Sequence, residues 1–167
     1  MEVVSIIAGL VLVVVIGEIH AYSPDQSKTT SLIALIFISM FAVLTCTNHF
    51  LYLTVLNKVT FESSNLNSIL SLGNWPSLVM AVDYLAWGLF LGLALLFAAA
   101  SFKGDRLRSA LRWTFVFSGT LCILGVVGVA LIDPLLWFVS VTGYGLGFPI
   151  ISILLTMLYI KSKWLSS

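Results

Sequence analysis

The sequence predicts an all-α fold, a polytopic transmembrane bundle of five helices that forms a single domain over residues 1–167. Three observations lead to this prediction. The chain is 60% hydrophobic and only 9% charged, whereas a soluble domain carries about 25% charged residues. Five apolar runs are long enough to cross a bilayer, which takes roughly 20 residues of helix. The runs lack the two-residue alternation of a barrel strand, so their backbone groups must pair within helices.

The five predicted spans cover about 3–22, 31–56, 77–102, 109–132 and 135–160. The first run resembles a signal peptide in length, but Glu2 precedes it without a Lys or Arg, and no small-residue cleavage pattern follows. We therefore expect a retained helix, with a signal-anchor role as the alternative.

The basic residues predict an orientation. Seven of the eight fall on one side of the five-span arrangement, and only Lys58 falls on the other. The seven are Lys28, Lys103, Arg106, Arg108, Arg112, Lys161 and Lys163. Because Lys and Arg favour the cytoplasmic side of short loops, we expect the N-terminus outside and the C-terminus inside.

Capping residues support the helix boundaries. Asp133-Pro134 combines an N-cap residue with a first-turn proline, which predicts the start of the fifth span. Asn74-Trp75-Pro76 predicts the start of the third span in a similar way and places a Trp at the interface. The preceding loop, residues 57–76, has apolar character. It forms either a short interfacial helix or an ordered cap on the bundle.

Glycines in two spans indicate close helix packing. Gly88 and Gly92 form a GxxxG pattern, for which we expect packing within the chain, with dimerisation as the alternative. In the fifth span, alternate glycines over residues 143–147 precede Pro149. This combination predicts a weakened and kinked helix.

Charge and motif content weigh against several function classes. The net charge is +1 with no basic stripe, which excludes a nucleic-acid binder. Cys46 and Cys122 lie inside predicted spans at no metal-ligand spacing, so we expect apolar thiols rather than a disulfide or redox pair. Neither a nucleophile elbow nor a phosphate loop occurs. The sequence leans against an enzyme, and it indicates no catalytic residue, no metal site and no identifiable cofactor.

Polar residues inside the spans are costly and therefore mark candidate sites. One face of the second span, within an arc of about 100°, carries Thr45, Asn48, His49 and Tyr52. The third span carries Asp83, with Trp87 one turn further on. His49 and Asp83 are each seven residues from the outer end of their span, so both lie roughly 10 Å below the outer surface at 1.5 Å per residue. Because the two spans are consecutive and antiparallel, we expect His49 and Asp83 to be in contact.

These residues predict an outward-facing pocket that binds a small lipophilic or amphipathic ligand. Its predicted lining is Asn48, His49, Tyr52, Asp83, Trp87 and Tyr144. A Trp beside a carboxylate is suited to a cationic amphiphile. The alternatives are a hydrogen bond that only joins two helices and acid–base work by the His–Asp pair.

A second polar group lies at the inner boundary. Glu18 and Tyr22 share a helix side, whereas His20 points elsewhere, and we expect an interfacial role for all three. His20 and His49 lie in opposite leaflets, which excludes a shared two-histidine haem site.

Two stretches carry a family resemblance. The first combines Glu18-Ile-His-Ala-Tyr22, Lys28-Thr-Thr-Ser, Asn48-His49-Phe50 and Leu53-Thr54-Val55, and the second runs from Asp83-Tyr-Leu-Ala-Trp87 through Gly92 to Phe97-Ala-Ala. Together they resemble a family of small five-span bacterial integral membrane proteins. The resemblance implies a multi-pass protein of the prokaryotic inner membrane and transfers no activity.

Three further functions remain open. The small size, the GxxxG pattern and the lack of chemical motifs also fit a structural or accessory subunit, with a second copy or other membrane subunits as partners. A small proton-coupled transporter fits the intramembrane ionisable residues, although no internal repeat supports it. A lipid-modifying enzyme would use His49. In every case the lipid bilayer is the expected surrounding.

Overall fold

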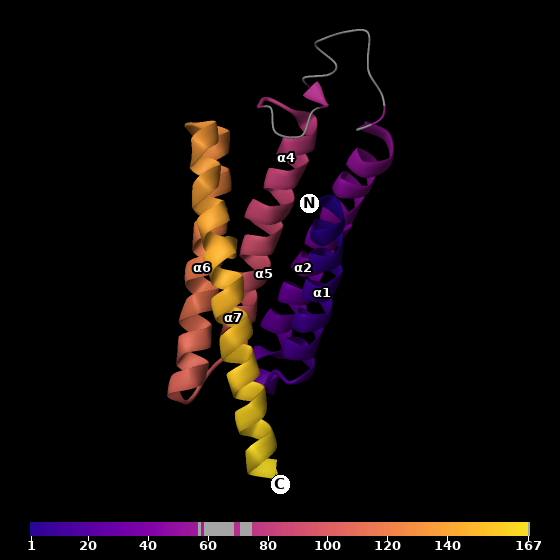
Figure 1. Cartoon of the computed structure of the whole chain (residues 1–167). Coiled ribbons are helices and arrows are strands. Elements are labelled where there is room, and N and C mark those ends of the chain that lie inside the picture. The colour runs from indigo at the N-terminus through magenta and orange to yellow at the C-terminus, as the bar shows by residue number, and fades with distance from the viewer. Residues whose placement is uncertain (57, 59–68, 71–74, 167) are drawn as a thin grey trace.

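The computed structural model describes residues 1–56, 58, 69–70 and 75–166, with side chains as far as Lys161. Its long helices run up and down beside one another (Figure 1), and no strand occurs in the described residues. Five helical stretches there are long and apolar enough to cross a membrane: Glu2–Ala21, Asp25–Leu56, Leu78–Ser101, Arg106–Leu131 and Pro134–Lys161. The prediction of five apolar, span-length helices is therefore confirmed. The predicted 57–76 loop falls largely outside the described residues, as do the side chains of Lys163 and Trp164.

Several spans combine more than one helical form. The elements are α1 (Glu2–Ala21), η1 (Asp25–Ser27), α2 (Lys28–Leu51), η2 (Tyr52–Leu56), α4 (Leu78–Tyr84), η3 (Leu85–Phe90), α5 (Leu91–Ala98), η4 (Ala99–Ser101), α6 (Arg106–Leu131), η5 (Pro134–Leu136) and α7 (Trp137–Ser166). Of these, η2 and η3 are π-helical. The second and third spans thus each contain a segment that is wider than an α-helix.

The fifth span begins as predicted, and the third does not. Asp133 Oδ1 accepts a hydrogen bond from the Leu135 backbone N–H at 2.7 Å, directly before the first-turn proline. In the third span, the cap is Ser77, whose hydroxyl oxygen accepts from Met80 N–H at 3.4 Å. The helix therefore begins at Leu78, after the proline. The predicted cap residue Asn74 lies outside the described residues.

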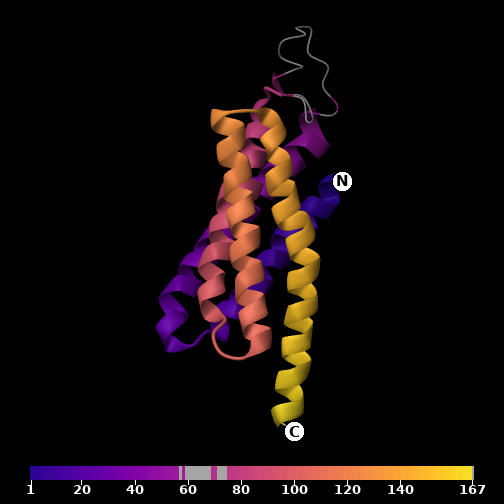
Figure 2. The ribbon, with the colours of Figure 1, turned by 90° about the vertical axis from the view of Figure 1, so that its left-hand side faces the viewer.

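Consecutive spans pack as antiparallel neighbours, α1 on α2, α2 on α5, α5 on α6 and α6 on α7. Figure 2 shows α6 and α7 side by side over most of their shared length, with α7 extending beyond. In Figure 1 the α1–α2 pair leans away from the α6–α7 pair toward the end at which α4 begins. We call this the N-terminal end. The opposite end, which carries Lys28, the 103–108 loop region and Lys161, is the basic end.

The glycine pattern of the third span is used for packing within the chain. Gly88 and Gly92 are buried, and a Cβ added at Gly92 would lie 2.7 Å from Ile123 Cγ1 of α6. The expected intramolecular packing is confirmed. In the fifth span, α7 stays helical across Pro149. The predicted weakening does not interrupt the helix, and Gly143 and Gly147 are positions where α7 approaches α6 closely.

Candidate functional site

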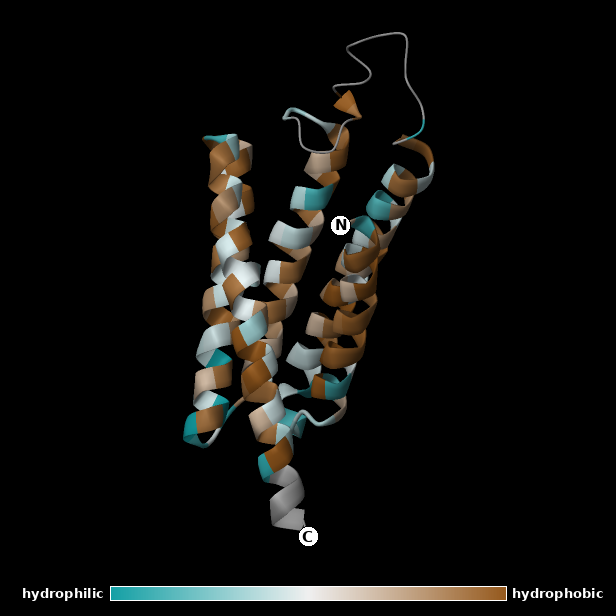
Figure 3. Ribbon diagram, viewed as in Figure 1, coloured by the Kyte–Doolittle hydropathy of each residue, from teal (hydrophilic) through white to brown (hydrophobic). Residues whose placement is uncertain are grey.

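Three ionisable side chains from three helices meet near the N-terminal end. Glu2 Oε2 of α1 lies 2.5 Å from His49 Nδ1 of α2, and Asp83 Oδ1 of α4 lies 3.3 Å from His49 Nε2. The second pair is at ion-pair distance, but Nε2 is not aligned for a hydrogen bond. The imidazole is therefore held between two carboxylates. In Figure 3, hydrophilic residues appear on α1, α2 and α4 at this level, within otherwise apolar helices.

The Glu2–His49–Asp83 site is largely buried, but two of its three side chains remain partly exposed. The side chain of His49 is 7% exposed, whereas those of Glu2 and Asp83 are 18% and 19% exposed. The two carboxylates thus form the accessible edge of the site, and the imidazole lies behind them.

Two further polar side chains of α2 border the site. Asn48 Nδ2 donates to the Val79 carbonyl oxygen at 3.1 Å and to Asp83 Oδ1 at 3.4 Å. This holds one oxygen of Asp83 in place. Thr45, one turn deeper on α2, is 0% exposed, and its hydroxyl has no hydrogen-bond partner among the described residues.

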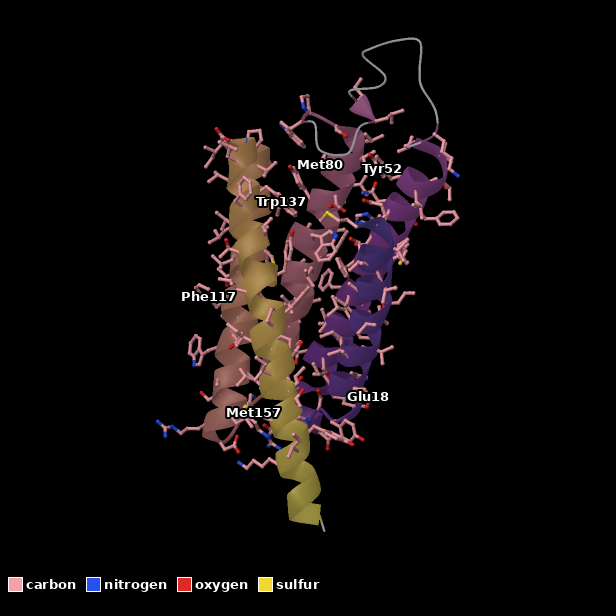
Figure 4. All side chains as sticks on the ribbon, in the orientation of Figure 1. Glu18, Tyr52, Met80, Phe117, Trp137 and Met157 are labelled. Atoms are coloured by element: carbon pink, nitrogen blue, oxygen red, sulfur yellow. The ribbon has the colours of Figure 1, made fainter. Side chains whose placement is uncertain are left out.

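Aromatic rings lie below and beside the charged group. The Trp87 ring, one turn from Asp83, lies 5.0 Å from the Phe41 ring and 4.9 Å from the Tyr144 ring, centroid to centroid. Above it, the Tyr84 ring lies 4.2 Å from the Trp137 ring. Figure 4 shows Met80 and Trp137 at this level, with Tyr52 nearby on the second span and Glu18 far away at the basic end. Aromatic rings thus lie both at the level of the polar side chains and one turn below them.

The structure brings most of the predicted lining residues together in two groups. Asp83 contacts both Asn48 and His49, so the predicted His49–Asp83 contact is present. Trp87 and Tyr144 are in contact with each other. Tyr52 is half-buried at the start of η2, and within the described residues neither a hydrogen bond nor a ring contact joins it to the other five.

Sequence reasoning missed Glu2, which it treated only as a residue flanking the first span. The feature that could have identified Glu2 as a site residue is the register of the α1–α2 hairpin. His20 meets Ser31 through a 2.9 Å hydrogen bond, Gly9 faces Ala42, and Glu2 meets His49. Moving toward the N-terminus of α1 by some number of residues corresponds to moving toward the C-terminus of α2 by the same number. A single known contact near the turn would therefore have placed Glu2 opposite His49.

Each π-helical segment follows directly on site residues. The η2 segment begins three residues after His49, and η3 begins two residues after Asp83. Single π-turns within α-helices are frequent at functional sites. The position of η2 and η3 beside His49 and Asp83 therefore agrees with a functional site at this level of the two spans.

Three polar side chains at the basic end, those of His20, Lys28 and Lys161, have structural partners. His20 is bonded to Ser31, and Lys28 Nζ donates to the His20 carbonyl oxygen at 2.8 Å, near the C-terminus of α1. Lys161 Nζ lies 2.5 Å from Asp105 Oδ2. This hydrogen bond, assisted by the Arg108 backbone N–H, holds the pKa of the Asp105 carboxyl below its ordinary value of 3.8.

Within the described residues, the His, Cys, Asp and Glu side chains form no group of three or more that could hold a metal ion. Cys46 and Cys122 are both free thiols, and a disulfide between them is absent.

Fold and site together define a class: over its described residues the chain is helical, with five helices long and apolar enough to cross a membrane and a largely buried group of ionisable residues between three of them. Comparisons with family models, with curated proteins and with solved structures give no match to the chain. The function must therefore be argued from the site itself.

Proposed function

We propose that the chain is a multi-pass membrane protein that binds a small amphipathic cation at the Glu2–His49–Asp83 site. One observation carries the proposal: two carboxylates share a single imidazole. With His49 protonated the three groups carry a net charge of −1, and with His49 neutral they carry −2. A positively charged ligand would neutralise this excess negative charge.

The energetics favour such a ligand. An unpaired carboxylate is expensive inside a membrane, where water cannot solvate it. Within the described residues, Glu2 and Asp83 form ion pairs only with His49. A cation at their exposed edge would lower that cost, and it would meet two oxygens that the imidazole does not use.

The surroundings favour an amphipathic ligand over a simple ion. Trp87 lies one turn from Asp83 and contacts Phe41 and Tyr144, so an apolar tail would find aromatic partners beside the charged group. Ring faces also attract cations. The Glu2, His49 and Asp83 side chains come from helices whose outer faces are apolar, and we expect the ligand to arrive from the lipid phase.

The proposed orientation places this site in the outer leaflet. In the predicted topology, seven of the eight basic residues lie at the basic end. The eighth, Lys58, follows the second span, whose end lies near the site. By the positive-inside rule, the N-terminal end faces outward. The membrane is then the inner membrane of a prokaryotic cell, as the family resemblance implies.

Mass spectrometry of the gently purified protein tests the proposal. We expect an organic cation to be retained by the wild type and lost in Asp83→Asn. The matched control is Asp25→Asn, which removes an exposed carboxylate at the basic end. Absence of a bound cation, or equal retention by Asp83→Asn, would contradict the proposal.

Proton-coupled transport is the second candidate, favoured by the position of His49 between two carboxylates. Such an imidazole can accept a proton at one nitrogen and release one at the other. Proton flux into proteoliposomes that disappears in Asp83→Asn would support transport, and flux unchanged by that substitution would remove it. For the accessory-subunit alternative, the GxxxG pattern is used in packing within the chain, which leaves the small size and the lack of chemical motifs as its support.

A further inference from the structure

Thr45 differs from four other threonines of this chain in the way its hydroxyl is used. Thr54, Thr114, Thr142 and Thr156 each donate to the carbonyl oxygen four residues earlier, at 2.7, 2.9, 2.9 and 2.8 Å. This is the usual bond for a threonine inside a helix. The Thr45 hydroxyl, although fully buried, makes no hydrogen bond with any described residue.

The position of Thr45 relates it to the charged site. It precedes Asn48 by three residues and His49 by four, so its side chain lies on the same face of α2, between theirs and one turn deeper. Asp83 contacts both Asn48 and His49 on that face. A buried polar group without a partner is costly and calls for a ligand or a water. The hydroxyl is therefore a free acceptor at the inner edge of the site.

The two carboxylates each add another free acceptor. Glu2 binds His49 through Oε2, and Asp83 contacts Asn48 and His49 through Oδ1. Among the described residues, Glu2 Oε1 and Asp83 Oδ2 have no hydrogen-bond partner. Three oxygens, on α1, α2 and α4, thus remain without a hydrogen-bond partner among the described residues.

We infer that the ligand of this site is a protonated primary amine with an apolar tail. An alkylammonium group carries three N–H donors, which match the three free oxygens in number. Hydrogen bonds from an ammonium to a carboxylate are about twice as strong as neutral ones. A quaternary ammonium has the same charge and can carry the same tail, but it has no N–H to donate. The site should therefore discriminate between the two. This inference rests on the proposed function, since it names the class of cation bound.

The test compares dodecylammonium with dodecyltrimethylammonium by equilibrium dialysis against the protein in lipid nanodiscs, with empty nanodiscs as background. We expect wild type to prefer dodecylammonium by about tenfold or more, as expected for hydrogen bonds to charged groups. In Thr45→Val the preference should fall by about threefold to tenfold, and in Thr45→Ser it should return. The control Thr47→Val, on the exposed side of α2, should leave the preference unchanged.

The outcomes separate this inference from the function on which it rests. Equal binding of both cations by the wild type would overturn the inference and leave the proposed function standing, whereas binding of neither would overturn both. Because the Thr45 hydroxyl has no partner in the described residues, Thr45→Val should fold with an unchanged or higher Tm. A Thr45→Val protein that fails to fold would show that the hydroxyl is structural, and it would also overturn the inference.

Discussion

Glu2 and His49, which are separated by 47 positions in the sequence, are joined by a 2.5 Å contact between Oε2 and Nδ1. The contact fixes the first turn of α1 to α2, near the end of its regular α-helical part. It also completes a charged group whose third member, Asp83, comes from another span. The N-terminal end of α1 is thus part of the site as well as part of the fold.

The Glu2–His49 contact should stabilise the α1–α2 hairpin. We expect Glu2→Gln to lower the free energy of unfolding by about 1–2 kcal/mol, because a charge-assisted hydrogen bond becomes a neutral one. The free energy of unfolding is measured in mixed micelles, with circular dichroism as the probe of unfolding. Glu18→Gln, at the exposed other end of the same helix, is the control, and an equal loss in both variants would refute a specific role for Glu2.

Two glycines in neighbouring helices should respond oppositely to the same substitution. A Cβ at Gly125 would collide with the backbone nitrogen and side chain of Ser140 on α7, whereas a Cβ at Gly145 would meet nothing within 4 Å. We expect Gly125→Ala to lower Tm, with an overpacking cost of about 1–3 kcal/mol. Gly145→Ala should leave Tm unchanged or raise it, because alanine favours helix by about 1 kcal/mol. A Tm for Gly125→Ala equal to that of the wild type would contradict the observed packing of α6 on α7.

The Asp105–Lys161 pair gives the basic end a pH dependence of defined sign. Because the pKa of Asp105 is lowered in the folded protein, its carboxylate stabilises the fold above the ordinary pKa of 3.8. That contribution disappears as the pH falls through the lowered value. Asp105→Asn should therefore melt slightly below the wild type at pH 7, with the gap closing in acid. A gap that persists or widens in acid would show that the ion pair is not its cause.

Trp87 should contribute to binding as well as to packing. We expect Trp87→Leu to weaken dodecylammonium binding by about tenfold, in line with a partly desolvated cation–π contact. Trp113→Leu, on an exposed face of α6, should not weaken binding. Fluorescence-detected melting of both variants separates lost affinity from lost folding, and unchanged affinity in a folded Trp87→Leu protein would remove the aromatic part of the site.

The fold followed from composition because a membrane leaves the backbone few alternatives. Long apolar runs must be helices, and the predicted spans agree with the observed ones within a few residues. The start of the third span was less predictable, since Asn74 and Ser77 are both good cap residues, and Ser77 is the residue that caps the helix.

The site was predictable only where depth along a helix determines position. Equal depth in adjacent spans was enough to bring His49 and Asp83 together. Glu2 required the register of the α1–α2 hairpin, which hydropathy does not encode. The free hydroxyl of Thr45 depends on a side-chain rotamer, and no pattern in the sequence distinguishes it from Thr54, which bonds its own helix.

The most direct test of the account is the affinity of dodecylammonium for the wild type and for Asp83→Asn in lipid nanodiscs, with Asp25→Asn as the control. Removal of a carboxylate from a buried charged contact typically costs at least about 1.4 kcal/mol, a factor of ten. The account predicts at least a tenfold loss of affinity in Asp83→Asn and none in Asp25→Asn. Equal affinities in all three proteins would contradict it.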